Sequence, residues 1–282
     1  MKLLGRRDLY NDGIGFVELW DNSRANISEE SRVEAVTQIA SISFGKDKSK
    51  NPEKLYQRLM KENASRPNTS FEFVPIVLGQ LEMVYLQELA SKVFNKTGKP
   101  YQPHCLKYGD ILVGKGEKPY IITNLRALLN DNLMSVKYFD KDISSWLNKS
   151  ENDFKLISEN SFCFRYKAPI FVVRHTIRHR VVANELSRRY TKDNFEFYQF
   201  DDVKVNYQSY VDEYYRLIKL GKKPEDARIV LPTALYTTIW QFYPKNQLDV
   251  FFNLRLDKAT QTQTRELAEK MKELVDEKLE NN

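Results

Sequence analysis

Basic side chains are concentrated in one stretch of the chain, between residues 165 and 192. This stretch contains eight Arg or Lys and a single carboxylate, Glu185. Six of the eight cations are arginines, whose planar and permanently charged guanidinium groups bind phosphates and carboxylates in a fixed geometry. The cations interrupt an apolar segment and continue into polar residues. This pattern favours an anion-binding pocket over a solvated basic helix end.

A helix is expected to position these cations. Pro169 suits the first turn of a helix, since its missing N–H would have no helical partner there. The polar stretch Asn184 to Tyr190 is predicted to favour turns, because its side chains compete for backbone hydrogen bonds. Side chains four residues apart share a helix face, which pairs two arginines and two histidines: Arg174 with Arg178, and His175 with His179.

The two histidines also have the spacing of metal ligands on a helix. However, the segment His-Thr-Ile-Arg-His lacks the glutamate of the zinc motif H-E-x-x-H. The neighbouring arginines would repel a divalent cation, and His104 lies far away in the sequence. We therefore expect no metal site here.

Hydrophobic periodicity predicts the elements around this helix. Ser28 is expected to cap a helix, and Gly221 to end another. Strands are expected at 15–20, 120–123 and 160–168. Helices are expected at 29–40, 52–61, 81–93, 124–130, 211–218 and 267–279, with a further helix starting at 224.

Composition limits the classes of protein to be considered. The net charge of +6 and the pI of about 9.0 favour anionic ligands such as nucleotides, folates or nucleic acid. Two cysteines are too few for a disulfide framework or a zinc ribbon. The sequence contains no recognisable signal peptide and no long apolar run, so a cytoplasmic protein without a membrane segment is expected.

The basic stretch resembles the motif of the flavin-dependent thymidylate synthases, A-P-I-F-V-A-R-Q-W-x-R-H-R followed by S-x-N-E-x-S-x-R-Y. His175 stands where that family usually has Gln, and one residue is missing between Arg180 and Asn184. The matching positions are Ala168 to Val172, Arg174, Arg178 to Arg180, Asn184, Glu185, Ser187, Arg189 and Tyr190.

Other segments extend the resemblance over residues 14–78 and 160–270. Residues 40–46, 227–232, 235–237 and 248–255 are similar to the family's A-R-V-S-Y-G-K, A-R-x-V-L-P, L-Y-T and L-x-N-F-L-x-L-R. Several flavin-side positions differ from the family pattern. Pro67 and Phe73 replace both histidines of H-x-T-P-F-E-H, Pro244 replaces the Asn of N-x-R, and Val250 replaces a further Asn.

The resemblance implies an α+β fold, in which a mixed sheet is flanked by helices. It also implies a homotetramer with active sites between subunits. Residues 79–158 have no counterpart in the family but contain predicted helices and strands. We therefore expect a catalytic domain of residues 1–78 and 159–282, interrupted by an inserted subdomain or lid. Gly114 to Lys118 resembles a phosphate loop only weakly and is expected to be a turn.

The resemblance further implies a role for each site residue. Arg255 would be catalytic, although it could instead be a surface arginine. Arg228 would come from a neighbouring subunit. Glu185 would lie near the ligands, although it could instead be an internal counter-charge for the arginines. The dUMP site would comprise His175, Arg178, Glu185, Ser187, Arg188, Arg189, Arg228 and Arg255. The FAD site would comprise Ser43, Thr69, Glu72, Arg178, His179, Arg180, Glu185 and Asn246.

The implied function is the reductive methylation of dUMP to dTMP with FAD, methylenetetrahydrofolate and NADPH. Neither cysteine has a neighbouring base, which disfavours cysteine attack at C6 of the uracil ring. In the flavin-dependent route, a fixed cation such as Arg255 would instead meet the charge that develops at N3 and O2. Two alternatives remain: another C5 modification of a pyrimidine nucleotide, such as hydroxymethylation, and a non-catalytic nucleic-acid-binding protein, the less expected of the two.

Overall fold

The computed structural model describes residues 1–63, 68–112, 119–147, 150–189 and 195–281. The chain folds into two compact units, each assembled from several segments. The first, the five-stranded unit, comprises Lys2–Trp20, Gln38–Ser49 and Phe162–Asn282. The second, the three-stranded unit, comprises Met1, Asp21–Thr37 and Lys50–Ser161.

The five-stranded unit is built on one sheet with the strand order β1-β2-β6-β8-β7. Strands β2 and β6 pair antiparallel, as do β7 and β8. The sheet brings together residues from both ends of the chain, because β2 comes from the N-terminal part and β8 from the C-terminal part. The strands are β1 (Lys2–Leu9), β2 (Gly15–Asp21), β6 (Ser161–Pro169), β7 (Val182–Glu185) and β8 (Tyr236–Pro244).

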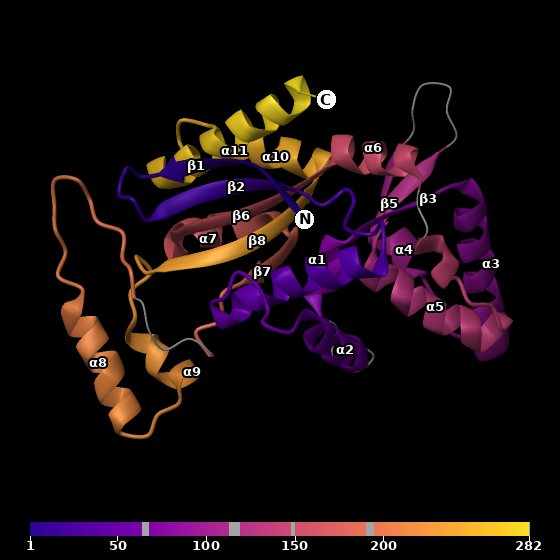
Figure 1. Ribbon diagram of the computed structural model, residues 1–282, viewed down its shortest axis with the longest axis horizontal. Coiled ribbons are helices and arrows are strands. Elements are labelled where there is room, and N and C mark those ends of the chain that lie inside the picture. Colours follow the sequence, from indigo (N-terminus) through magenta and orange to yellow (C-terminus); the bar gives the residue numbers. More distant parts are fainter. Residues whose placement is uncertain (64–67, 113–118, 148–149, 190–194, 282) are drawn as a thin grey trace. The chain divides into compact units, whose positions relative to one another are not determined.

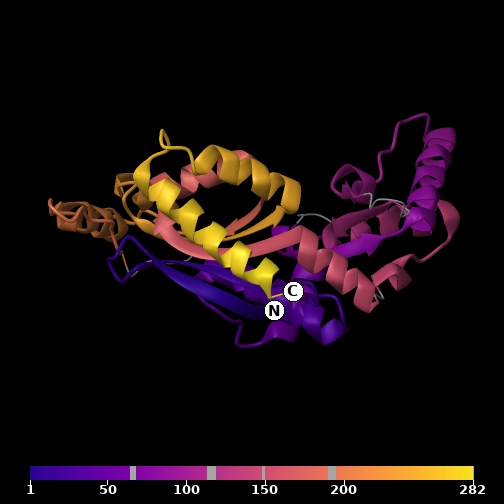
Figure 2. The same cartoon turned by 90° about the horizontal axis from the view of Figure 1, so that it is seen from above.

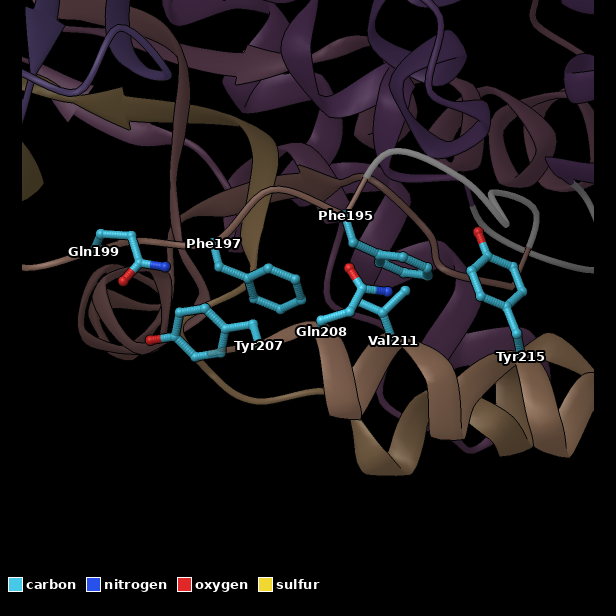
Figure 3. Close-up of a pocket in the computed structure, with 7 residues that line it drawn as sticks. All are labelled: Phe195, Phe197, Gln199, Tyr207, Gln208, Val211 and Tyr215. Carbon is cyan, nitrogen blue, oxygen red and sulfur yellow. The ribbon is translucent and has the colours of Figure 1, made fainter. Parts of the chain in front are cut away.

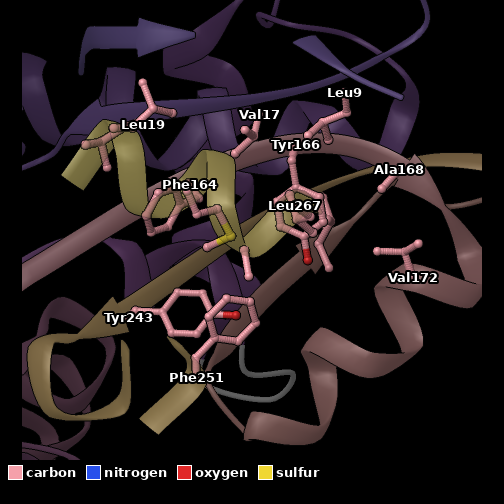
Figure 4. Packing of buried hydrophobic residues seen from close by; sticks show 14 of the residues in the cluster. Leu9, Val17, Leu19, Phe164, Tyr166, Ala168, Val172, Tyr243, Phe251 and Leu267 are labelled. Carbon is pink, nitrogen blue, oxygen red and sulfur yellow. The ribbon is translucent and has the colours of Figure 1, made fainter. Parts of the chain in front are cut away.

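Alternating residues of β6 form the centre of the core. Phe162, Phe164 and Tyr166 are each at most 1% exposed, and strand geometry places them on the same face. Three helices pack onto that face: α7 (Ile170–Thr176), α10 (Lys245–Arg255) and α11 (Thr262–Glu280). Figure 4 shows Val172, Phe251 and Leu267 from these helices around the aromatic side chains of the sheet.

The C-terminal helix α11 packs along β1 and beside α10 (Figure 1, Figure 2). Gly5 permits this close approach, because a Cβ atom at that position would lie 2.7 Å from Cδ2 of Leu274. A side chain there would require the side chain of Leu274 to move. Helix α10, which carries Arg255, packs against α11 and β8.

The basic helix begins at the expected place but is shorter than expected. Pro169 precedes α7, and the chain tightens after Thr176 into a 3₁₀ turn, η4 (Ile177–His179). Arg180 then adopts a left-handed backbone conformation with φ of 55°, which ends the turn. The change of pitch means that Arg174 and Arg178 lie near different neighbours.

The prediction of turns at 184–190 is wrong for Asn184 and Glu185, which belong to β7. These residues pair with β8, with Asn184 opposite Trp240 and Glu185 opposite Ile239. The backbone hydrogen bonds of the strand outweigh the local preference of Asn and Glu for turns. The side chain of Asn184 also donates to the carbonyl of Ile39 at 2.7 Å, which fixes the strand to the end of α1 (Glu29–Ser41).

Helices α8 (Gln208–Lys219) and α9 (Pro224–Ala227) lie beyond the end of the five-stranded sheet (Figure 1). Gly221 follows α8 with φ of 82°, as expected for a residue that ends a helix. The 3₁₀ turn η5 (Arg228–Val230) continues from α9 and carries Arg228.

The three-stranded unit contains a small sheet with the order β3-β5-β4, and both pairs are antiparallel. Asn124 at the end of β5 caps α5 by accepting from the Ala127 N–H at 3.0 Å. Its strands are β3 (Pro75–Leu78), β4 (Asp110–Leu112) and β5 (Tyr120–Asn124). Its helices are α2 (Pro52–Asn63), η2 (Thr69–Phe73), α3 (Gln80–Thr97), α4 (His104–Lys107), α5 (Leu125–Phe139), η3 (Ser144–Leu147) and α6 (Glu151–Asn160).

The expected α+β class is confirmed, as are the predicted strands that became β2, β5 and β6 and the helices that became α1, α2, α3, α5, α8, α9 and α11. Residues 79–158 do not stand alone: they share a compact unit with residues 50–78. Their role as an insertion or lid stays a prediction. Pro67, Tyr190 and the Gly114 to Lys118 loop lie outside the described residues. No helix in the described part of the chain is long and apolar enough to cross a membrane.

Candidate active site

Arg255 is held against the basic helix by two hydrogen bonds. Its Nε donates to Nε2 of His179 at 3.0 Å, and its Nη2 donates to the carbonyl of His175 at 3.1 Å. Because a guanidinium has no acceptor, Nε2 of His179 must be unprotonated, and the imidazole is neutral in this arrangement. The edge-on contact with Phe251, with centroids 5.0 Å apart, fixes the same ring. Among the residues that the structure describes, Nη1 of Arg255 has no hydrogen-bond partner and is available to a ligand.

The surroundings disfavour protonation of both histidines. Burial lowers the pKa of His179, and the charge of Arg255 lowers it further. Burial also lowers the pKa of His175, as do Arg255 and Arg178. Oγ1 of Thr264 lies 3.3 Å from Nδ1 of His175, so each histidine is held at one ring nitrogen.

Glu185 lies among several arginines. Partial burial raises the pKa of its carboxyl, although part of the side chain is exposed to solvent. Four groups oppose that rise: the hydroxyl of Thr237, which donates at 2.9 Å, and the charges of Arg228, Arg174 and Arg188. Glu185 is therefore a hydrogen-bond acceptor surrounded by arginines. This position suits both of its predicted roles, as a ligand-binding residue and as an internal counter-charge.

The backbone around Ser187 is held in place by the turn after α1. The Ser187 N–H donates to the Ser43 carbonyl at 3.2 Å, and Oγ of Ser43 donates to the Glu185 carbonyl at 3.4 Å. The Arg189 N–H donates to Oγ of Ser187 at 3.4 Å. Ser43, assigned to FAD, and Ser187, assigned to dUMP, are thus brought together.

Arg188 and Arg189 lie in different surroundings, one partly buried and the other exposed. Nη2 of Arg188 donates to the Tyr236 carbonyl at 3.2 Å, and burial lowers the pKa of this arginine. Arg189 is exposed and forms an ion pair with Glu225 at 3.1 Å. An exposed pair is worth only about 0–1 kcal/mol, so Arg189 can exchange this partner for a ligand phosphate at little cost.

Arg228 lies near Glu185 within one chain, because its charge acts on that carboxyl. Its Nε donates to the Glu225 carbonyl at 3.1 Å, and the residue is exposed. One chain therefore already brings Arg228 close to Glu185, whereas its supply by a neighbouring subunit stays a prediction.

The other predicted FAD residues are distributed over both units. Arg178 and Arg180 are exposed at the end of the basic helix, and Asn246 is exposed at the start of α10. Thr69 and Glu72 belong to η2 of the three-stranded unit. Within the five-stranded unit, the structure therefore brings Arg178 and His179 to Arg255, and it brings Ser43 to Glu185 and Ser187. It does not test the contribution of Thr69 and Glu72.

An aromatic pocket of about 330 Å³ borders Arg188 and was not singled out as a site in the sequence (Figure 3). Cζ of Arg188 lies 5.2 Å from the ring centroid of Phe195, and the rings of Phe197 and Tyr207 stack at 4.6 Å. Gln208, Val211 and Tyr215 of α8 complete the pocket beneath Phe195. In the sequence, only the aromatic residues at 195–200 indicated this pocket. The other lining residues belong to α8, which a connecting segment separates from them.

The lowered pKa values of the histidines predict a pH dependence of stability. Below their ordinary pKa of 6.5, His175 and His179 take up protons in the unfolded chain before they do so in the native protein. The native state must therefore lose stability as pH falls from 6.5. The raised pKa of Glu185 has the opposite effect above pH 4.5, where it stabilises the native state as pH falls. We expect the urea midpoint of the wild type to fall more steeply between pH 7.5 and 5.5 than that of a His175→Asn/His179→Gln variant.

Both proteins contain Glu185, so its contribution cancels in the difference between the two pH profiles. Parallel profiles would show that the two histidines do not titrate differently in the native and unfolded states.

Comparisons with known proteins identify the family of the chain. A family model described as "Thymidylate synthase complementing protein" matches residues 137–280. The flavin-dependent thymidylate synthase of Thermotoga neapolitana is 35% identical over 138 residues, which cover 42% of this chain and 62% of that protein. The flavin-dependent thymidylate synthase of Kosmotoga olearia is 30% identical over 192 residues, which cover 54% of this chain and 83% of that protein.

Among solved structures, the UMP/dUMP methylase PolB from Streptomyces cacaoi bound with 5-Br UMP matches 42% of this chain and 69% of that chain. The match has 25% identity and a TM-score of 0.36. A score this low adds nothing to the relationship found by sequence. The family match spans half of the chain, and the Kosmotoga relative is matched over most of its length. The chain therefore belongs to the flavin-dependent thymidylate synthase family.

Proposed function

We propose that this protein catalyses the reductive methylation of dUMP to dTMP, with FAD as cofactor and methylenetetrahydrofolate and NADPH as co-substrates. The observation that supports the proposal is the number of arginines at the site: Arg174, Arg188 and Arg228 act on Glu185, and Arg178 acts on Arg255. In the parts of the chain that the structure describes, Arg174, Arg178 and Arg180 have no carboxylate within ion-pair distance. Cations that lack a protein counter-charge favour an anionic ligand.

Each group of residues has a distinct task in this proposal. Ser187 and Arg189 bind the nucleotide phosphate, and Arg228 adds a third contact. Arg255 presents Nη1 to the uracil ring, where a fixed guanidinium stabilises the charge that develops at N3 and O2. The neutral His179 holds that guanidinium without adding a competing positive charge. A homotetramer is part of the proposal, in line with the predicted supply of Arg228 by a neighbour.

The residues present also fit a flavin cofactor. Arg178 and Arg180 offer exposed guanidinium groups to a pyrophosphate, and Ser43 and Asn246 offer polar side chains. When bound, FAD supplies the reducing chemistry of the reaction. Several flavin-side positions differ, however: Phe73 is fully buried and Val250 is half exposed, and neither can donate a hydrogen bond.

Replacing Arg189 by alanine is expected to weaken dUMP binding by about ten- to a hundredfold. The loss of one hydrogen bond to a charged group costs about 1.5–3 kcal/mol. Isothermal titration of the full-length protein with dUMP measures the change. Arg216→Ala is the matched control, because Arg216 is also exposed and paired, with Glu213 at 2.6 Å on α8. Unchanged dUMP affinity in Arg189→Ala would contradict the phosphate assignment.

FAD is expected to bind saturably but weakly, so that the protein can be purified without colour. Each missing hydrogen bond to a charged partner forfeits about 1.5–3 kcal/mol, or roughly one to two decades of affinity. Titration of FAD into the apo-protein, followed by flavin fluorescence, measures its dissociation constant. Binding in the micromolar range or better is the expected result. No binding, even with dUMP present, would exclude the flavin-dependent reaction.

A further inference from the structure

A side-chain amide is fully buried on β8, and the proposed reaction gives it no task. Gln241 is 0% exposed and lies opposite Ala183 of β7. Ile239 and Tyr243, two residues away on either side, belong to the core, so Gln241 points to the same side of the sheet. A buried amide loses its hydration, and its place in an apolar core must be explained by the groups that it contacts.

Two tyrosine hydroxyls converge on the carbonyl oxygen of this amide. Oε1 of Gln241 accepts from the hydroxyl of Tyr166 at 2.7 Å and from that of Tyr243 at 2.9 Å. Burial raises the pKa of both tyrosines, so both hydroxyls remain donors. Nε2 of Gln241 is also buried and has no hydrogen-bond partner in the described part of the chain. A buried donor without an acceptor costs stability, which points to a role for this amide other than stabilising the core.

The first connection from Gln241 leads to the end of the basic helix. The hydroxyl of Tyr166 lies 2.6 Å from Oγ1 of Thr176, the last residue of α7. The preceding residue, His175, accepts from Nη2 of Arg255 at 3.1 Å through its carbonyl. Tyr166 and Thr176 therefore join Gln241 to one of the two hydrogen bonds that hold Arg255.

The second connection leads to the other of these hydrogen bonds. The ring of Tyr243 packs on that of Phe251, with centroids 5.4 Å apart, and Figure 4 shows these two rings in the core. Phe251 in turn contacts the ring of His179, with centroids 5.0 Å apart. Nε2 of His179 accepts from Nε of Arg255 at 3.0 Å. Gln241 is thus the point from which both connections start.

We propose that Gln241 is a positioning residue for Arg255, because it fixes both groups that hold the guanidinium: the carbonyl of His175 and the ring of His179. Its importance for the reaction rests on the proposed function, whereas the positioning itself is a property of the ligand-free protein. A guanidinium held at two points presents its remaining donors in one geometry, and a small misplacement near the reacting atoms lowers the rate strongly. Gln241 acts through other residues and is not itself catalytic.

Kinetics and binding of the Gln241→Met variant test the proposal. Methionine keeps an unbranched side chain of similar size but removes the amide. We expect kcat to fall about tenfold or more, while the dissociation constant of dUMP changes by less than about threefold. Thr238→Val is the matched control, because Thr238 is buried on the same strand but on its opposite face, and it should change neither value. An unchanged kcat in Gln241→Met, or equal losses of kcat and affinity, would overturn the proposal.

A second measurement needs no activity. The chain has three histidines, so a ring signal of carbon-13-labelled His179 is assigned by its loss in His179→Gln. Burial and the charge of Arg255 lower the pKa of His179. If Gln241→Met releases Arg255, this pKa should rise in the ligand-free, full-length protein, and it should not change in Thr238→Val. An unchanged pKa in Gln241→Met would overturn the proposal whatever the kinetics. A wild type that binds FAD and dUMP but forms no dTMP would contradict the proposed methylation alone.

Two further substitutions test the connections separately. Tyr243→Phe and Thr176→Val each remove one hydroxyl with little change of shape. Each should lower kcat by about threefold, and the double variant should approach the loss in Gln241→Met. If Gln241→Met does not fold, the double variant tests the same two connections. Wild-type kcat and a wild-type pKa of His179 in the double variant would overturn the proposal.

Discussion

Replacing Arg255 by lysine is expected to lower kcat by about 10²- to 10³-fold while changing dUMP affinity by less than about tenfold. The guanidinium uses Nε and Nη2 to hold its position against His179 and His175, and it presents Nη1 to the ligand. A lysine keeps the charge but has a single nitrogen, so it cannot make both positioning contacts and also reach the substrate. The charge that develops on the uracil ring would then be stabilised less well.

Single-turnover rates and dUMP titrations of the same protein separate the two effects. Arg58→Lys is a suitable control, because Arg58 is 55% exposed on α2 and takes part only in a surface pair with Glu62. It should match the wild type in both measurements. If Arg255→Lys lost affinity and turnover in equal proportion, Arg255 would have a binding role and no special role in the chemistry.

Replacing Asp131 by alanine is expected to destabilise the protein by about 3–5 kcal/mol. The substitution leaves the hydroxyl of Tyr101 and the N–H groups of His104 and Cys105 without their acceptor. Burial and the nearby carboxylate raise the pKa of Tyr101, so its hydroxyl remains a donor that needs an acceptor. Each buried donor left unsatisfied costs about 1–3 kcal/mol.

Urea unfolding monitored by circular dichroism measures this loss. Asp249→Ala, at an exposed position of α10, should change the free energy of unfolding by less than about 0.5 kcal/mol. A loss below about 1 kcal/mol in Asp131→Ala would mean that water replaces the carboxylate and that α4 is not fixed to α5 through it.

Elements with a strong local pattern could be predicted from the sequence. The alternation of Phe162, Phe164 and Tyr166 predicted β6, and the same side chains form the centre of the core. Strand β1 has no such alternation, because Leu3 and Leu4 are adjacent and both more than a third exposed. It is a strand because β2 and α11 pack against it, and these contacts are distant in the sequence.

Contacts between residues distant in the sequence also determine the site, and local patterns could not predict them. The chemical types at Arg255, His179 and Glu185 could be recognised from their motifs. The hydrogen bond between Arg255 and His179 joins residues 76 positions apart and depends on how α10 packs against α7. The strand at Asn184 was missed for the same reason, since only its pairing with β8 outweighs the turn preference of its residues. Tertiary contacts decided these features, and no local pattern encodes them.

The pairing of β2 with β6 affects how the protein can be synthesised. Glu18 lies opposite Arg165, so β2 leaves the ribosome roughly 150 residues before its partner strand. At about 5–20 residues per second, that interval is on the order of 10–30 s. Val17 and Leu19, fully buried in the finished protein, remain exposed during this time on a strand with an unpaired edge. The nascent chain therefore passes through a period in which a chaperone that covers this strand would prevent aggregation.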